Sequence, residues 1–216
     1  MRRGLTFVLG VVLALGAPAA ASAATLAVTP SKACYGTGER VTFQGAGFTP
    51  GGIVDFTRDG EPIPTKNDED IMAGRSGDVE ADLPLANARG SERRTYAVID
   101  RQNPALTASV ELRISELNVD ISPDGGQPFR LRRITATGFT KGSDTLYAHI
   151  VHRGRVRNMR IGDVKGPCGR VNAKRRLFGR TPPSGRHTIR FDTRRRYLDR
   201  APAQRYRWRF TIFNPR

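Results

Sequence analysis

The chain contains few of the residues that build metal, redox or hydrolytic centres. Its 216 residues include two cysteines, three histidines and one tryptophan, which is too few for an iron–sulfur cluster and leaves little for a structural zinc site. The sequence also lacks a His-Glu-x-x-His zinc helix, a Gly-x-Ser-x-Gly nucleophile elbow and a Gly-x-x-x-x-Gly-Lys phosphate loop. We therefore expect a protein that is not an enzyme and has no catalytic residues, metal or cofactor.

The histidines and the one acidic run do not combine into a recognisable site. His149 and His152 are three residues apart, so on a strand they face opposite sides, and His187 stands alone. The run Asn-Asp-Glu-Asp at 67–70 offers oxygen ligands for calcium but lacks the spacing of a known calcium loop. We expect this run to be a solvated loop.

Only one long apolar run is present, and it lies near the start of the chain. Arg2 and Arg3 precede the apolar residues 5–15, and Ala21-x-Ala23 follows them. A membrane-spanning helix needs about 20 apolar residues, whereas a basic start, a short apolar run and an A-x-A site are typical of a signal peptide. We expect residues 1–23 to be removed and the rest to be secreted, extracellular or associated with the cell wall, without a transmembrane segment.

Export changes the expectation for the two cysteines. Outside the cytoplasm, Cys34 and Cys168 would tend to form one disulfide. Closing a loop of roughly 130 residues would stabilise the fold by about 4–5 kcal/mol. Two separate buried or free thiols remain the alternative, because the sequence does not show whether the two Cα atoms come within bridging distance.

Helical periodicity is absent, and glycine and proline recur too often for long helices. Short alternating runs instead predict an all-β protein. The predicted strands cover residues 25–29, 40–46, 53–58, 78–84, 93–101, 106–114, 117–121, 129–137, 145–152, 155–161, 186–192 and 205–213. Two sandwiches fit this length and spacing. We expect them at 24–115 and 116–216, placed end to end with almost no linker.

The two halves also share a short motif. Gly-Phe-Thr-x-Gly occurs at Gly47–Gly51 and again at Gly138–Gly142. In each half the motif follows one predicted strand and precedes another, which in turn ends at a glycine turn. The matching order of strands and turns predicts a duplicated domain.

The motif and its surroundings resemble a known kind of module. The stretch 41–52, Val-Thr-Phe-Gln-Gly-Ala-Gly-Phe-Thr-Pro-Gly-Gly, resembles immunoglobulin-like modules of the IPT/TIG kind in secreted bacterial proteins. Gly-Pro-Cys-Gly at 166–169 and the stretch 185–192 make the second half similar to the second module of exported actinobacterial proteins of unknown role. The resemblance implies two tandem immunoglobulin-like β-sandwiches that serve spacing, adhesion or display. The Cys…Trp…Cys core of antibody domains is missing, since Trp208 lies on the last predicted strand.

Charge separates the two halves. The whole chain has a formal net charge of +16. Residues 24–115 hold 10 Lys and Arg against 13 Asp and Glu, a net charge of −3, whereas residues 116–216 hold 24 against 7, a net charge of +17. A GC-rich genome explains arginine in place of lysine, but it does not explain why one half is acidic and its neighbour basic. Because like charges on one small domain repel, we expect an anionic partner to offset them, with neutralisation by the acidic neighbouring half and incidental charge as the alternatives.

The last predicted strand alternates arginine with aromatic residues. Tyr206, Trp208 and Phe210 share one face, which we expect to pack in the core, while arginines at 205, 207 and 209 share the other at intervals of about 6.5–7 Å. Guanidinium groups bind phosphate, sulfate or carboxylate through two hydrogen bonds. We predict one basic face on the second sandwich that binds a polyanion. Its residues are Arg175, Arg176, Arg190, Arg194, Arg195, Arg196, Arg205, Arg207 and Arg209.

The predicted partner is an anionic polymer, either a teichoic-type polymer, an acidic polysaccharide or extracellular nucleic acid. Proteins that bind single-stranded nucleic acid normally expose aromatic side chains for stacking, and here the aromatic residues point toward the predicted core. Cell-wall polymers and acidic polysaccharides are therefore favoured. Two alternatives stay open: a structural surface or matrix spacer whose charge is incidental, and a hydrolase with its site at the domain junction.

Overall fold

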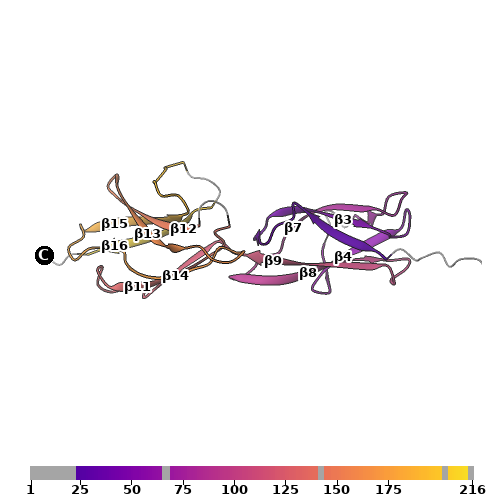
Figure 1. The fold of residues 1–216 in the computed structure, drawn as a ribbon, viewed down its shortest axis with the longest axis horizontal. Coiled ribbons are helices and arrows are strands. Elements are labelled where there is room, and N and C mark those ends of the chain that lie inside the picture. The colour runs from indigo at the N-terminus through magenta and orange to yellow at the C-terminus, as the bar shows by residue number, and fades with distance from the viewer. Residues whose placement is uncertain (1–22, 65–68, 141–143, 201–203, 214–216) are drawn as a thin grey trace, which may run out of the picture.

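Sixteen strands of the described residues make up two elongated bodies that lie end to end (Figure 1). The structure, a computed structural model, describes residues 23–64, 69–140, 144–200 and 204–213. These residues form strands, turns and bends but no helix. None of the segments that the structure describes is a helix of the length and apolar character needed to cross a membrane. The predicted signal peptide, except for its last residue, lies outside the described residues.

The first body, which we call the N-terminal sandwich, contains two facing sheets. Its strands are β1 (Thr25–Thr29), β2 (Tyr35–Gly36), β3 (Arg40–Ala46), β4 (Ile53–Arg58), β5 (Glu61–Pro62), β6 (Ile71–Met72), β7 (Val79–Pro84), β8 (Ser91–Asp100) and β9 (Thr107–Ser115). One sheet has the order β1-β3-β7 and the other β2-β9-β8-β4-β5, with β6 paired to β4. All pairs are antiparallel except β2 with β9.

The second body, the C-terminal sandwich, repeats this plan. Its strands are β10 (Asn118–Ser122), β11 (Leu131–Thr137), β12 (Thr145–His152), β13 (Arg155–Asp163), β14 (Val171–Arg176), β15 (Gly185–Asp192) and β16 (Tyr206–Ile212). One sheet has the order β10-β11-β14 and the other β13-β12-β15-β16. In chain order, β1, β3 and β7 correspond to β10, β11 and β14, and β4, β8 and β9 correspond to β12, β15 and β16. The shared topology supports the duplication that the Gly-Phe-Thr motif predicted.

Each sandwich has its own hydrophobic core, and the alternating sequence explains why. In β7, Val79 and Leu83 are buried between exposed acidic residues, which is the pattern of a strand with one face against the core. One cluster of buried residues extends from Tyr35 to Ile114 and the other from Val119 to Ile212, with no shared member. The all-β sandwich prediction is therefore confirmed.

In each sandwich, a glycine lets a distant turn pack closely against the Gly-Phe-Thr turn. Phe48 and Phe139 of the two motifs are buried. A glycine from a distant turn lies against each of them, and backbone N–H groups of Phe48 and Phe139 donate to the carbonyls of Gly77 and Gly169. Gly169 has a φ of 59°, and a Cβ added there would collide with the Phe139 backbone, lying 2.8 Å from its nitrogen.

Gly169→Ala is expected to destabilise the C-terminal sandwich by about 2 kcal/mol more than Gly166→Ala. Both glycines occupy the left-handed region, which costs an alanine about 1–2 kcal/mol, but nothing lies within 4 Å of a Cβ added at Gly166. The difference between the two variants isolates the collision from the backbone strain. Thermal unfolding followed by circular dichroism measures it, and equal melting temperatures would show that the loop moves aside without cost.

The two sandwiches are joined twice. The chain passes from β9 to β10 through Glu116 and Leu117 alone, and Glu116 is held by its N–H to the Gly90 carbonyl (2.8 Å) and by the Thr137 hydroxyl on its carbonyl (3.0 Å). The second link is a disulfide between Cys34 and Cys168, whose Cα atoms are 5.2 Å apart. Both cysteines are buried. The predicted disulfide is confirmed, and it connects the two sandwiches rather than two strands of one sandwich.

Candidate functional site

The outer face of the β13-β12-β15-β16 sheet carries a dense set of arginines. Arg207 and Arg209 lie on β16, exposed and on the opposite side from Trp208 and Phe210, as the alternation predicted. Trp208 and Phe210 pack partly buried against the core. Arg207 pairs with Arg190 of β15, and the exposed Arg186 of β15 lies diagonally across from Arg209. Such diagonal neighbours are about 7–8 Å apart. We call this set of exposed cations, with the loop arginines described below, the arginine face.

The segment between β15 and β16 folds back over this sheet, and two of the predicted arginines form ion pairs and ring contacts beneath it. The guanidinium groups of Arg190 and Arg205 lie 5.1 and 5.4 Å from the centre of the Tyr197 ring. Arg190 donates to Asp199 at 3.0 Å, and Arg205 donates to Asp192 at 3.2 Å. Arg205 lies one residue before β16 and is covered by this segment, with its side chain 10% exposed, so its prediction as an exposed member of the strand face is wrong. Arg190 is likewise bound within the protein.

Beneath the segment lies a buried polar network. Nε2 of His149 is 3.0 Å from one Asp192 carboxylate oxygen, its Nδ1 is 2.7 Å from the Asn158 side-chain oxygen, and both His149 and Asp192 are almost fully buried. Burial opposes the charge on His149, but the hydrogen bond to Asp192 raises the pKa of the imidazole above its ordinary value. Burial also opposes the charge on Asp192, but the hydrogen bonds from His149 and the Arg194 N–H lower the pKa of the carboxyl. The network holds the arginine-bearing segment on the sheet.

The predicted arginines at 194–196 are exposed in this segment. Arg195 and Arg196 face Arg160 of β13 across an open basin of about 580 Å³, which is also lined by Tyr147 and Asn158. Arg160 pairs with Asp163. The arginine face thus extends from β13, over the segment, to β16. Arg160 and Arg186 were not predicted from the sequence, although Arg186 alternates with Arg190 and could have been placed on the same face by that spacing.

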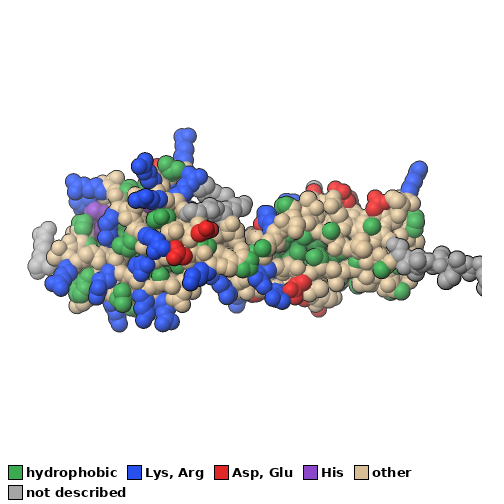
Figure 2. Space-filling view, viewed as in Figure 1, with side chains coloured by type: hydrophobic (Ala, Val, Ile, Leu, Met, Phe, Trp, Pro, Cys, Tyr) green, Lys and Arg blue, Asp and Glu red, His purple; other side chains and the backbone are tan. Residues whose placement is uncertain are grey.

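Arg175 and Arg176 lie elsewhere. Their strand, β14, pairs with β11 in the opposite sheet, so the prediction that all nine arginines share one face is wrong. Neighbouring residues on a strand also point to opposite sides. Arg176 is exposed, whereas Arg175 is partly buried and donates to the carbonyls of Lys174 and Arg160. In Figure 2, Lys and Arg side chains project from both the upper and the lower margin of the C-terminal sandwich.

The outer face of β11 and β14 forms a second basic surface, with Arg133 directly opposite Lys174 and Leu131 opposite Arg176. Figure 2 shows more red on the N-terminal sandwich, where acidic and basic side chains mix. Among the described residues, no ion pair joins the two sandwiches. In the part of the chain that the structure describes, the basic residues of the C-terminal sandwich therefore form their ion pairs with carboxylates of the same sandwich.

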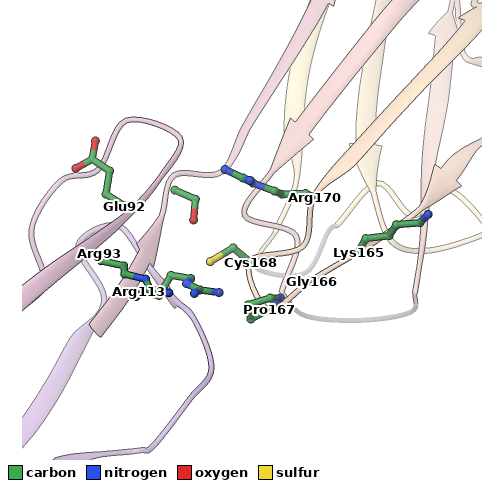
Figure 3. A pocket seen from close by; sticks show the side chains of 9 residues that line it. Glu92, Arg93, Arg113, Lys165, Gly166, Pro167, Cys168 and Arg170 are labelled. Atoms are coloured by element: carbon green, nitrogen blue, oxygen red, sulfur yellow. The ribbon is translucent and has the colours of Figure 1, made fainter. Parts of the chain in front are cut away.

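A cavity of about 370 Å³ lies at the junction, beside the disulfide. In Figure 3, Arg93 and Arg113 point from β8 and β9 toward the loop that carries Cys168, and Arg170 extends back toward the N-terminal sandwich, whereas Lys165 points away. Arg93 pairs with Glu111 at 3.1 Å. None of the described residues lining this cavity is a histidine. The hydrolase alternative needs a histidine and a carboxylate within hydrogen-bond reach in an open pocket, and the junction cavity does not supply that arrangement.

The acidic run at 67–70 lies partly outside the described residues. Of the two residues that are described, Asp70 pairs with Arg101 at 3.1 Å. Within the described part of the chain, no group of three or more His, Cys, Asp or Glu side chains could hold a metal ion.

Comparisons with known proteins give a distant similarity only. No family model matches the chain, and no curated protein matches it. The human OSCAR ligand-binding domain aligns over 88% of this chain and 98% of its own length, with 12% identity and a TM-score of 0.31. A mutant of Salmonella alpha-2-macroglobulin aligns over 90% of this chain and 15% of its own, with 14% identity and a TM-score of 0.31. No functional conclusion follows from similarity at this level.

Proposed function

We propose that this chain is an exported, non-enzymatic binding protein whose arginine face binds an extended anionic polymer. The observation that carries the proposal is a set of exposed arginines, on one sheet and on the segment that folds over it, that pair with no carboxylate among the described residues. They are Arg186, Arg195, Arg196, Arg207 and Arg209. The N-terminal sandwich, with its nearly balanced charge, would act as a spacer. Both would be modules of the IPT/TIG kind from an exported actinobacterial protein.

The arrangement suits repeated anionic groups better than a single small anion. Alternate residues on a strand repeat at about 6.5–7 Å, so Arg207 and Arg209 present two guanidinium groups at a spacing similar to that of phosphates along an extended polymer. Each guanidinium can hold one phosphate, sulfate or carboxylate with two hydrogen bonds. The Asp192 network fixes the segment that carries Arg195 and Arg196, so these arginines have less conformational freedom to lose on binding.

The positions of the aromatic residues favour an acidic polysaccharide or a teichoic-type polymer over nucleic acid. Trp208 and Phe210 stack on each other with ring centres 5.2 Å apart and pack against the core. Tyr197 is covered by Arg190 and Arg205. These rings are therefore engaged within the protein. Phe213, directly after β16, is 84% exposed and offers one ring, whereas single-strand binders use several exposed rings on which successive bases stack.

Replacing Arg186, Arg207 and Arg209 by glutamine is expected to lower the sodium chloride concentration that elutes the full chain from a heparin column. Removing three contacts to a polyanion reduces both the affinity and its dependence on salt. The matched control is Arg133→Gln, Lys174→Gln and Arg176→Gln, which removes the same charge from the opposite sheet of the same sandwich.

The control should elute much closer to the unchanged protein. If both triple variants elute at the same reduced salt concentration, retention reports net charge alone and the arginine face is not a site. That result would favour the alternative of a surface spacer with incidental charge.

A further inference from the structure

A second cavity lies at the end of the C-terminal sandwich that is farthest from the junction. It has a volume of about 370 Å³ and sits between the β12–β13 turn and the segment that connects β14 to β15. Its apolar lining includes Ile150, Val156 and Phe178, together with the prolines at 182 and 183. A pocket of this size that combines an apolar lining with a few polar groups is typical of small-ligand sites.

Two histidines form one wall of this pocket, which we call the distal pocket. The rings of His152 and His187 stack with their centres 4.2 Å apart and their planes at 18°. Phe178 meets His187 edge-on at 5.1 Å. Phe178 and His187 are 4% and 2% exposed, and Phe178 also stacks on Phe210. The partly buried His152 is therefore the ring of this wall that can offer a surface to the C–H face of a sugar or to another ring.

His187 carries a polar atom that the described part of the protein leaves without a partner. The side chain is 2% exposed, and its Nε2 is 2.9 Å from the Pro183 carbonyl, to which it donates. The other ring nitrogen, Nδ1, is buried and has no hydrogen-bond partner among the described residues. Nε2 donates to the Pro183 carbonyl, so in the neutral ring, which burial favours by lowering the pKa of His187, Nδ1 is an acceptor. A buried acceptor without a donor is costly, and a ligand hydroxyl that displaced the atoms covering Nδ1 would satisfy it.

Arginines surround the mouth of the distal pocket. Arg155 and Arg180 are exposed, and Arg157 donates to the Leu177 carbonyl. Within the described residues, none of the three pairs with a carboxylate. The pocket thus combines flat apolar walls, one buried acceptor and a cationic rim.

We propose that the distal pocket binds an acidic sugar unit, a hydroxylated ring that carries one carboxylate or phosphate. A ring hydroxyl would donate to His187 Nδ1, the ring face would pack on His152 and Val156, and the anionic group would bind Arg155 or Arg180. This inference deepens the proposed function and rests on it in one respect: the acidic sugar would be a unit of the polymer that the arginine face binds. It identifies the polymer as an acidic polysaccharide.

Histidine side-chain NMR of the full chain tests the proposal directly, because the sequence contains only three histidines. Titration with D-glucuronate is expected to shift the imidazole signals of His152 and His187 but not that of His149, which is buried beneath the segment between β15 and β16. D-glucose, which lacks the anion, and benzoate, which lacks the hydroxyl, should bind at least about tenfold more weakly. Equal binding of glucose, or tighter binding of 4-hydroxybenzoate than of glucuronate, would overturn the assignment.

Two sets of variants locate the site. Arg155→Gln with Arg180→Gln changes only exposed side chains, so folding is preserved, and it should weaken glucuronate about tenfold. His187→Gln keeps an N–H that can donate to Pro183 but moves the acceptor, now the amide oxygen, away from the Nδ1 position, and it should reduce the preference for hydroxylated ligands. Arg207→Gln with Arg209→Gln is the matched control and should leave glucuronate binding unchanged.

The proposal for the distal pocket and the proposal for the arginine face can be contradicted independently of each other. If glucuronate does not shift His187 while the arginine-face variants still elute early from heparin, the pocket inference is wrong and the polymer-binding proposal stands. If glucuronate binds at His187 but the arginine-face variants elute like the unchanged chain, the polymer-binding proposal fails and the pocket remains.

Discussion

Replacing Cys34 and Cys168 by serine is expected to lower the free energy of unfolding of each sandwich by about 4 kcal/mol. While the disulfide is intact, a sandwich that unfolds stays tied to its folded neighbour at two points, the connection at Glu116–Leu117 and the disulfide. Unfolding the C-terminal sandwich then leaves a closed loop of about 50 residues, and unfolding the N-terminal sandwich one of about 80. Loops of these lengths lose about 4 kcal/mol of chain entropy.

Guanidinium denaturation, followed by circular dichroism, measures this effect. The unchanged protein in reductant should match the serine variant, and the variant should not respond to reductant. Because the two cores share no residue, the variant should still unfold cooperatively. An unfolding midpoint identical to that of the oxidised protein would show that the disulfide orients the sandwiches without stabilising either one.

Asp192→Asn is expected to destabilise the C-terminal sandwich by about 3 kcal/mol, since removing one partner of a buried charge network leaves the others uncompensated. The Asn side-chain oxygen can still accept a hydrogen bond from His149, but its NH₂ group would face the Arg205 guanidinium. Both of these groups are donors, so the hydrogen bonds from Arg205 would be lost. The control is Asp199→Asn. Asp199 pairs with Arg190 at a similar distance but is 84% exposed, and pairs of that kind contribute less than about 1 kcal/mol. Similar losses in both variants would contradict a special role for Asp192.

The same network predicts how stability changes with pH. The lowered pKa of Asp192 means that its contribution is complete above the ordinary value near 3.8 and is lost as the pH falls through the lowered value. The raised pKa of His149 means that its contribution is complete below the ordinary value of 6.5 and is lost as the pH rises through the raised value. Both contributions are present together only between these two ordinary values.

The C-terminal sandwich should therefore unfold at lower denaturant at pH 8 than at pH 5.5, and Asp192→Asn should remove most of that difference. Unfolding series of the two proteins at both pH values measure it. A difference that persists unchanged in the variant would place its origin at another titrating group.

Strands with regular alternation could be predicted from the sequence almost to the residue. β3, β4 and β12 begin and end where their patterns do. β14 was missed because Val171–Arg176 ends in three cations and has only two apolar residues to mark its inner face. The two-residue strands β2, β5 and β6 are too short to produce a pattern. Local alternation thus predicts a strand only where enough apolar side chains reach the core.

The candidate site could be predicted only in part, because long-range pairing decides where an arginine lies. Arg207 and Arg209 follow from alternation within one strand. Arg190 and Arg205 are bound internally because their carboxylate partners, Asp199 and Asp192, reach them only after the chain folds back. The distal pocket depends on the pairing of β12 with β15, which stacks His152 on His187. Contacts between residues so far apart in the chain leave no pattern in the local sequence.

The disulfide also sets the path that mechanical force would follow. β1 begins at one end of the elongated molecule and β16 lies in the sandwich at the other (Figure 1). A pull between Thr25 and Ile212 would pass from Cys34 to Cys168 through the sulfur atoms, whose sequence separation is 134. The intervening chain, roughly 450 Å when fully extended, would bear no tension and could not lengthen. Under load in an oxidising environment, the molecule could lengthen only through residues 25–34 and 168–212, and adding a reductant would make the chain between the two cysteines extensible as well.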